Sequence, residues 1–199
     1  MKKVALVLLA VASIALGLWF GLQAPTRQSA PNSLAAVGGD FTLASESGPV
    51  SLHDFRGKVV AIYFGYTRCP DVCITSLSKL AAALKGMSLQ ERERIQPIFI
   101  SVDPERDTPA IAQQYASFFY PDAIGLSGTP EEIAEIARRY LVIYEKVELE
   151  GSAMAYSVDH SSVIYVVGPD GAMRALVQHA DDANVLAQQL RAALPDQES

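Results

Sequence analysis

The chain has 199 residues, 50% of them hydrophobic, which is enough for one domain with a sizeable core and a tail. Its formal net charge is -6, and no basic run follows the N-terminal segment. A nucleic-acid-binding function is therefore excluded, because phosphate groups are recognised by clustered Lys and Arg.

The N-terminus carries a long uncharged apolar run. Lys2 and Lys3 precede residues 4–22, which contain no charged side chain. The run is close to the roughly 20 residues of a membrane-spanning helix, and two lysines before it favour a cytoplasmic N-terminus. We therefore expect residues 1–23 to be a single transmembrane anchor in the inner membrane, with the domain facing the periplasm. A cleavable signal peptide is the alternative, and it predicts the same exported compartment.

A linker and a hairpin follow the apolar run. Residues 24–37 are rich in Ala, Pro and Ser, a composition typical of a flexible tether, so the domain is expected to occupy residues 38–197. Residues 41–43 and 50–52 flank a turn rich in Ser, Gly and Pro, which predicts an N-terminal β-hairpin.

The next segment has the pattern of a β-α-β unit. Residues 59–66 and 97–102 are short apolar runs rich in strand-forming residues, as expected for two buried parallel strands. Between them, apolar residues recur at three-and-four spacing from Leu77 to Leu84, which predicts a helix.

Two Thr-Pro pairs then predict helix starts. Pro109 follows Thr108, and proline is favoured at the first helical position. Thr129 precedes the second helix, and Glu132 three residues later completes a capping box. Residues 144–149 and 155–158 are candidate short strands.

The C-terminal part predicts an antiparallel hairpin and a last helix. Strands over residues 163–167 and 173–177 are joined by the turn signal at residues 168–171, and Asp181 or Asp182 can cap the helix. A β-α-β unit followed by such a hairpin and helix is the thioredoxin arrangement. The predicted fold class is therefore α/β, a thioredoxin-like fold with an N-terminal hairpin and a single N-terminal transmembrane helix.

The chain has two cysteines, Cys69 and Cys73, directly after the first buried strand. Spacing of four puts two helical side chains on one face, and a helix N-terminus favours the thiolate. The pair therefore suits thiol–disulfide exchange or a soft metal such as Cu(I) or Zn(II). A structural disulfide is disfavoured, because so small a loop constrains the unfolded chain little. Asp71 lies between the cysteines and would oppose a thiolate if its side chain pointed inward.

A metal site needs a third ligand, and the chain offers three histidines. His160 precedes the strand at residue 163, and in a thioredoxin-like arrangement the loop before that strand faces the cysteines. Asp159 is the neighbouring residue that we expect to orient the imidazole. His53 is interpreted as a surface residue, and His179 as a surface or capping residue.

Two further features lie beside this predicted site. The polar segment 101–109 follows the second strand and either gates the site or binds a partner, or is an ordinary turn with a helix cap. Met154 is a candidate weak copper ligand, since thioethers suit Cu(I), but a core or hairpin methionine is the favoured interpretation.

Three segments together resemble the Sco/SenC family: residues 64–73 (FGYTRCPDVC), 101–109 (SVDPERDTP) and 158–162 (VDHSS). The resemblance covers about residues 38–195. It implies a thioredoxin fold, an N-terminal anchor, and copper, as Cu(I) or Cu(II), held by Cys69, Cys73 and His160. One departure is Ile74, where many members of the family have proline.

The family resemblance implies a copper metallochaperone for the assembly of the copper centre of cytochrome c oxidase, rather than a turnover enzyme. The implied partner is the copper-bearing oxidase subunit or another periplasmic copper chaperone. The alternative is a thiol–disulfide oxidoreductase that reduces the oxidase cysteines or those of other exported proteins. A peroxiredoxin-like peroxidase ranks below both, because the threonine expected before a peroxidatic cysteine has no clear match near Thr67.

Overall fold

The computed structural model describes residues 33–152 and 154–195, almost all of which belong to one compact unit that begins at Leu34. The predicted anchor at residues 1–23, and residues 24–32 of the predicted linker, lie outside the described residues. Within the described ranges, no helix has both the length and the apolar composition needed to cross a membrane.

The described chain opens with η1 (Ser33–Ala36), a 3-10 helix inside the range that composition predicts to be a linker, and Val37 after it is buried. The hairpin β1 (Thr42–Ser45) and β2 (Gly48–Ser51) is antiparallel, as predicted. A second 3-10 helix, η2 (Leu52–Phe55), follows it. The folded domain therefore begins before residue 38, inside the range 24–37 that was predicted to be a linker.

The centre of the domain is a five-stranded sheet with the order β5-β4-β3-β8-β9. Its strands are β3 (Val59–Gly65), β4 (Ile95–Ser101), β5 (Ile124–Leu126), β8 (Val163–Val167) and β9 (Met173–Gln178). β3, β4 and β5 are parallel, whereas β8 is antiparallel to β3 and β9 to β8. All seven residues of β3 are buried, as expected for a central strand covered on both faces.

Five helices surround the sheet: α2 (Val72–Lys85), α3 (Leu89–Glu93), α4 (Pro109–Phe119), α5 (Pro130–Tyr140) and α6 (Ala183–Ala193). Both Thr-Pro pairs start helices as predicted, and the capping box of Thr129 and Glu132 is formed in both directions. Asp182, one of the two predicted candidates, caps α6. The sequence did not predict α3 and β5, which are only five and three residues long.

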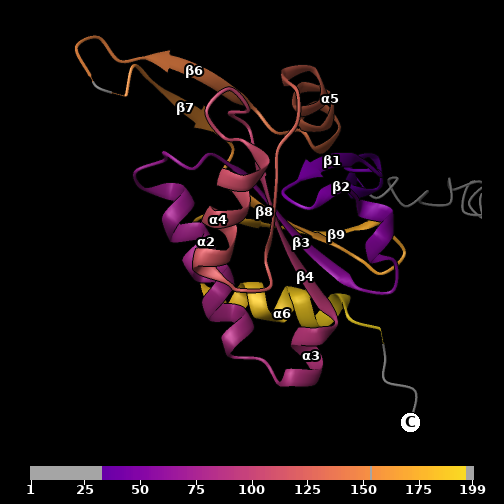
Figure 1. Cartoon of the computed structure of the whole chain (residues 1–199). Helices are drawn as coiled ribbons and strands as arrows, with labels where there is room; N and C mark the ends of the chain where they lie inside the picture. Colours follow the sequence, from indigo (N-terminus) through magenta and orange to yellow (C-terminus); the bar gives the residue numbers. More distant parts are fainter. Residues whose placement is uncertain (1–32, 153, 196–199) are drawn as a thin grey trace, which may run out of the picture. The chain divides into compact units, whose positions relative to one another are not determined.

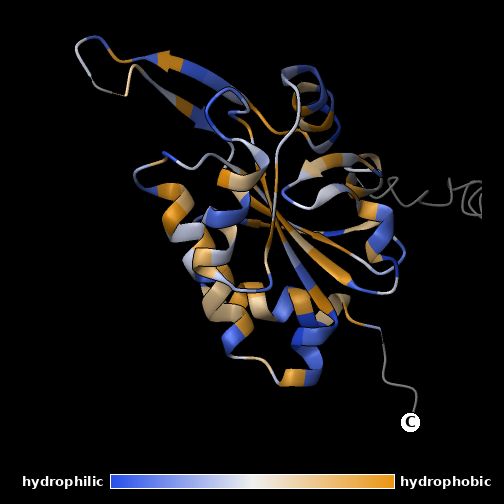
Figure 2. Cartoon of the chain, viewed as in Figure 1, coloured by the Kyte–Doolittle hydropathy of each residue, from blue (hydrophilic) through white to orange (hydrophobic). Residues whose placement is uncertain are grey.

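The two faces of the sheet are covered by different elements (Figure 1). Tyr63 and Phe99 are partners in the register of β3 and β4, and Phe99 packs on Tyr115 of α4. α2, α4 and α6 lie on this face. On the other face, Phe64 packs against Tyr140 at the end of α5, with ring centroids 5.4 Å apart. Apolar residues accordingly follow the central strands (Figure 2).

A separate two-stranded arm projects from the domain (Figure 1). It consists of β6 (Tyr144–Glu148) and β7 (Tyr156–His160), which pair antiparallel with each other and with no other strand among the described residues. Four of the five residues of β6 are exposed. His160 is the last residue of β7, opposite Tyr144, rather than a loop residue as the sequence suggested. The domain thus has the thioredoxin-like arrangement expected, with an arm inserted before β8.

Candidate metal centre

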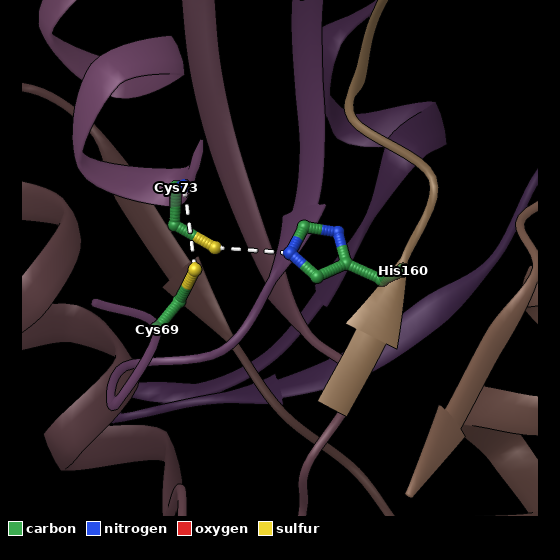
Figure 3. Close-up of side chains that lie close together, drawn as sticks. All are labelled: Cys69, Cys73 and His160. Atoms are coloured by element: carbon green, nitrogen blue, oxygen red, sulfur yellow. Dashed lines mark hydrogen bonds between the residues drawn. The ribbon is translucent and has the colours of Figure 1, made fainter. Parts of the chain in front are cut away.

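Three side chains meet at the C-terminal end of β3 (Figure 3). The sulfurs of Cys69 and Cys73 and a ring nitrogen of His160 all lie within 4.8 Å of one another. Cys73 is fully buried, Cys69 is 6% exposed, and His160 is partly buried. Both cysteines are free thiols. The structure therefore gathers residues that are 87 positions apart in the chain into one group of soft and borderline donors.

The two cysteines do not share a helical face, so the sequence-based argument for their proximity was wrong. α2 begins at Val72 with Asp71 as its N-cap, and Cys69 lies before the helix. The residue before a proline is biased away from helical conformation, and Cys69 precedes Pro70. Instead, the Cys69 sulfur accepts a hydrogen bond from the backbone N–H of Cys73 at 3.4 Å. The Cys69 sulfur is thus held near Cys73 by a hydrogen bond that it accepts at the start of α2.

The imidazole of His160 is held with one nitrogen toward the sulfurs. Nδ1 lies 3.1 Å from the carbonyl oxygen of Ser161, which can only accept, so Nδ1 carries the hydrogen. Nε2 faces the Cys73 sulfur at 3.1 Å. The rings of Tyr63 and Tyr66 pack edge-on against the imidazole, with centroid distances of 6.0 and 5.9 Å. The contact with Ser161 therefore orients the ring with Nε2 toward the sulfurs, as a metal ligand at that nitrogen requires.

The two thiols differ in acidity. A hydrogen bond from Cys73 lowers the pKa of Cys69 to about 4, against the effect of burial and with help from His160 and the backbone N–H groups of Asp71 and Cys73. The pKa of Cys73 is raised, mainly by the same hydrogen bond with Cys69 and to a smaller extent by burial. Without metal at neutral pH, Cys69 is the thiolate and Cys73 the thiol.

Gly65, the last residue of β3, allows the buried sulfur to approach the sheet. A Cβ at this position would lie 2.8 Å from the sulfur of Cys73 and 2.9 Å from the ring of Tyr63. Both distances are shorter than van der Waals contact. The strand therefore needs glycine here so that Cys73 can lie directly against it.

An open hollow of about 390 Å³ leads from solvent to this group. Its lining includes Cys69, His160, Tyr66, Asp71 and Asp159. Both carboxylate residues are exposed on the outside of the group. The expected role of Asp159 in orienting the imidazole is replaced by the Ser161 carbonyl, because Nδ1 contacts that oxygen. Asp71 does not point inward against the thiolate; it is the exposed N-cap of α2.

The other histidines and Met154 lie outside the group. His53 is exposed on η2, as expected for a surface residue. Nδ1 of His179 lies 3.0 Å from the hydroxyl oxygen of Ser76 on α2. Met154 does not line the hollow, and its backbone carbonyl accepts a hydrogen bond from Arg106.

Three polar side chains of the segment 101–109 are buried, Ser101, Asp103 and Asp107, and Asp107 contacts the cysteine loop. The carboxylate of Asp107 is fully buried and accepts hydrogen bonds from the backbone N–H of Thr67 at 2.9 Å, its hydroxyl at 2.6 Å, and the hydroxyl of Ser101 at 2.6 Å. The sequence indicated a polar loop beside the site, but not the contacts of Asp107, Tyr63 or Tyr66. The signal for Asp107 was an acidic residue in a loop that follows a buried strand.

A thioredoxin-like domain with two cysteine sulfurs and an imidazole nitrogen at the end of its central strand is the arrangement of a soft-metal-binding or thiol-redox protein. The SCO1/SenC family model matches residues 29–195. This chain therefore belongs to the SCO1/SenC family.

Relatives and solved structures agree with that assignment. The chain is 46% identical over 137 residues to protein SCO1 homolog 1, mitochondrial, of Arabidopsis thaliana, a match that covers 68% of this chain and 40% of the relative. It is 38% identical over 184 residues to the SCO2 homolog, mitochondrial, of Bos taurus, covering 88% of this chain and 69% of the relative. The structure of Bradyrhizobium japonicum ScoI with copper bound matches with a TM-score of 0.71 and 40% identity, over 80% of this chain and 100% of that one.

Proposed function

We propose that this protein binds one copper ion through Cys69, Cys73 and His160 and delivers it for the assembly of the copper centre of cytochrome c oxidase. The observation that carries the proposal is the donor set, two sulfurs and Nε2 within 4.8 Å. Thiolate sulfur selects Cu(I), and imidazole suits copper in either oxidation state. The copper-bound state of the similar Bradyrhizobium japonicum ScoI supports the same metal.

The geometry suits a metal that is held and then passed on. Three protein ligands leave copper with an open coordination position, and the hollow in front of them provides access for a donor atom of a partner. Exchange of thiolates one at a time then moves the ion without releasing it into solution. Oxidation of the Cys69 thiolate and Cys73 thiol to a disulfide, in which an external two-electron oxidant takes two electrons and one proton is released, would remove two of the three ligands.

The same proposal includes a place for the domain and a partner. The apolar run at residues 4–22 would anchor the chain in the inner membrane with the domain in the periplasm. The partner would be the copper-bearing oxidase subunit or another periplasmic copper chaperone. The apolar run in the sequence and the family support this location. The test is labelling of Cys69 and Cys73 in intact and in permeabilised cells.

The proposal is tested by copper stoichiometry and affinity. The full chain is purified in detergent, fully reduced, and titrated against a competing Cu(I) chelator. We expect one tightly bound copper per chain, no tight Cu(I) binding in Cys69→Ser or Cys73→Ser, and weaker binding with a changed Cu(II) spectrum in His160→Ala. His53→Ala is the matched control, because His53 is exposed and outside the group. Unchanged affinity in all three ligand variants would contradict the proposal.

A thiol–disulfide oxidoreductase is the second candidate, favoured by the unequal acidity of the two thiols. An attacking thiolate at Cys69 beside a protonated Cys73 is typical of disulfide exchange. The three residues between the cysteines and the presence of His160 speak against this as the sole role. The two functions separate in His160→Ala, which would weaken copper binding but leave the rate of disulfide exchange with a peptide substrate almost unchanged.

A further inference from the structure

The arm that carries His160 is tied to the domain through a residue that lies far from the copper ligands in the sequence. Building on the proposed function, we propose that Arg106 is a positioning residue for His160. Its guanidinium fixes the start of β7, four residues before His160, and so holds the imidazole within reach of the two sulfurs.

The first observation is a fork of hydrogen bonds from Arg106 onto the arm. Nη1 donates to the backbone carbonyls of Met154 at 3.1 Å and Tyr156 at 3.0 Å, where β7 begins. Nε donates to the carboxylate of Asp103, which is fully buried, and the Arg106 side chain is only 11% exposed. Nη2 is buried and has no hydrogen-bond partner among the described residues, so Nε and Nη1 alone fix the orientation of the guanidinium.

A second set of contacts closes a triangle around the same point. The guanidinium carbon lies 3.6 Å from the centroid of the Tyr156 ring, and the Tyr156 hydroxyl donates to Asp103 at 2.7 Å. Asp103 in turn lies two residues after the end of β4, and its backbone N–H donates to the hydroxyl of Ser101. The first residue of β7 is thereby locked to the end of a central strand.

The position of Tyr156 determines that of His160. The two residues are the first and last of β7, and alternate residues of a strand face the same side, so Tyr156, Val158 and His160 all point the same way. Val158 between them is buried. The guanidinium also lies 5.8 Å from the ring of Tyr66, which itself packs against the imidazole.

The loop that contains Arg106 also holds the other half of the site. One residue later, Asp107 binds the backbone and hydroxyl of Thr67 in the cysteine loop. Residues 103–107 thus connect the loop with Cys69 to the arm with His160. β6 on the outer side of the arm is mostly exposed, so it offers little packing that would replace this connection.

The test is Arg106→Gln in the full chain, studied beside His160→Ala and the double variant. We expect Cu(I) affinity to fall about 10-fold in Arg106→Gln, since loss of an outer partner of a metal ligand typically lowers affinity by 10–100-fold. The electron paramagnetic resonance spectrum of the Cu(II) form should shift toward that of His160→Ala. In the His160→Ala background, Arg106→Gln should cause no further loss. Arg138→Gln is the control, because that arginine is 71% exposed and pairs with Glu135 on α5.

A copper-free measurement separates this proposal from the proposed function. In the reduced, metal-free chain, hydrogen exchange of the β6–β7 amides should accelerate in Arg106→Gln, while exchange in α2 is unchanged. Absence of copper binding in the wild type would contradict the proposed function, but not the attachment of the arm by Arg106. Unchanged exchange in the arm would overturn the positioning role, and so would an affinity loss equal in both backgrounds. If Arg106→Gln does not fold, Tyr156→Phe removes only the hydroxyl bond to Asp103, and the same exchange pattern is expected to a smaller degree.

Discussion

The two halves of the metal centre are built differently. The cysteine half lies in the core: Cys73 is fully buried against β3, and Asp107 holds the adjoining loop through two hydrogen bonds from Thr67. The histidine half lies at the base of an arm whose outer strand is mostly exposed (Figure 1). Both halves contribute to one group of donors, but the arm joins the core through one buried residue, Val158, with Tyr144 and Tyr156 packed against the core.

This difference suggests how such a site can hold and release an ion. Regions with few buried apolar contacts open locally at low free energy, whereas core strands open only when the domain unfolds. Opening of the arm would withdraw His160 while Cys69 and Cys73 stay in place, and the contacts of Arg106 and Tyr156 oppose that opening. A site with two fixed sulfur ligands and one adjustable nitrogen ligand would keep copper bound at every step of a transfer.

The largest expected effect concerns the acidity of Cys69, which tests whether the cysteine half is preorganised by itself. Because the pKa of Cys69 is lowered to about 4, its thiolate persists as the pH falls from 8 to 5. The alkylation rate of the reduced, metal-free chain by iodoacetamide should therefore stay nearly constant over that interval. An ordinary thiol, with a pKa of about 8.5, loses roughly 10-fold in rate per pH unit below that value.

Two variants locate the cause of that acidity. Cys73→Ala removes the largest contribution, the hydrogen bond from the Cys73 side chain, and should restore a steep decline of the rate below pH 8. His160→Ala removes a smaller contribution and should leave the profile nearly flat. A steep decline in His160→Ala alone would show that the arm, and not the core, controls the thiolate.

An intermediate effect is expected from Gly65→Ala, which disturbs the cysteine half without changing a ligand. The added methyl group would meet the Cys73 sulfur at 2.8 Å and the Tyr63 ring at 2.9 Å. Overpacking of a core typically lowers the free energy of unfolding by about 1–3 kcal/mol. Denaturant unfolding should show that loss, and Cu(I) competition should show weaker binding. Gly86→Ala at the end of α2 is the control, since its Cβ would make only ordinary contacts at 3.5 and 3.6 Å.

The core of the fold was predictable from sequence because each element carried its own local signal. Buried strands appeared as apolar runs, and the two Thr-Pro pairs marked helix starts that the structure confirms at Pro109 and Pro130. β5 was not predicted, because three residues with one glycine show no periodicity. Its place in the sheet depends on long-range packing, including Gly125 lying directly against the backbone of α4.

The metal centre was predictable in its donors but not in its supports. Two cysteines after a strand and a distant histidine indicate a metal site through the chemistry of their side chains alone. The hydrogen bond from Nδ1 to the Ser161 carbonyl depends on backbone geometry, so Asp159 was chosen on adjacency instead. The role of Arg106 depends on carbonyls 48 and 50 residues away, which no local pattern in the sequence indicates.

The smallest expected effect comes from the outer side of the arm. Lys146 pairs with Glu105 at 2.6 Å and lies 4.9 Å from the Tyr156 ring, but the two charged side chains are 41% and 57% exposed. Exposed ion pairs contribute about 0.2–1 kcal/mol, because water screens the charges and ordering two long side chains opposes the attraction. Lys146→Met should therefore change Cu(I) affinity less than about 2-fold and leave hydrogen exchange at the start of β7 unaltered. A loss as large as that of Arg106→Gln would mean that the arm is held from its exposed side, and the contrast between a buried anchor and an adjustable arm would have to be abandoned.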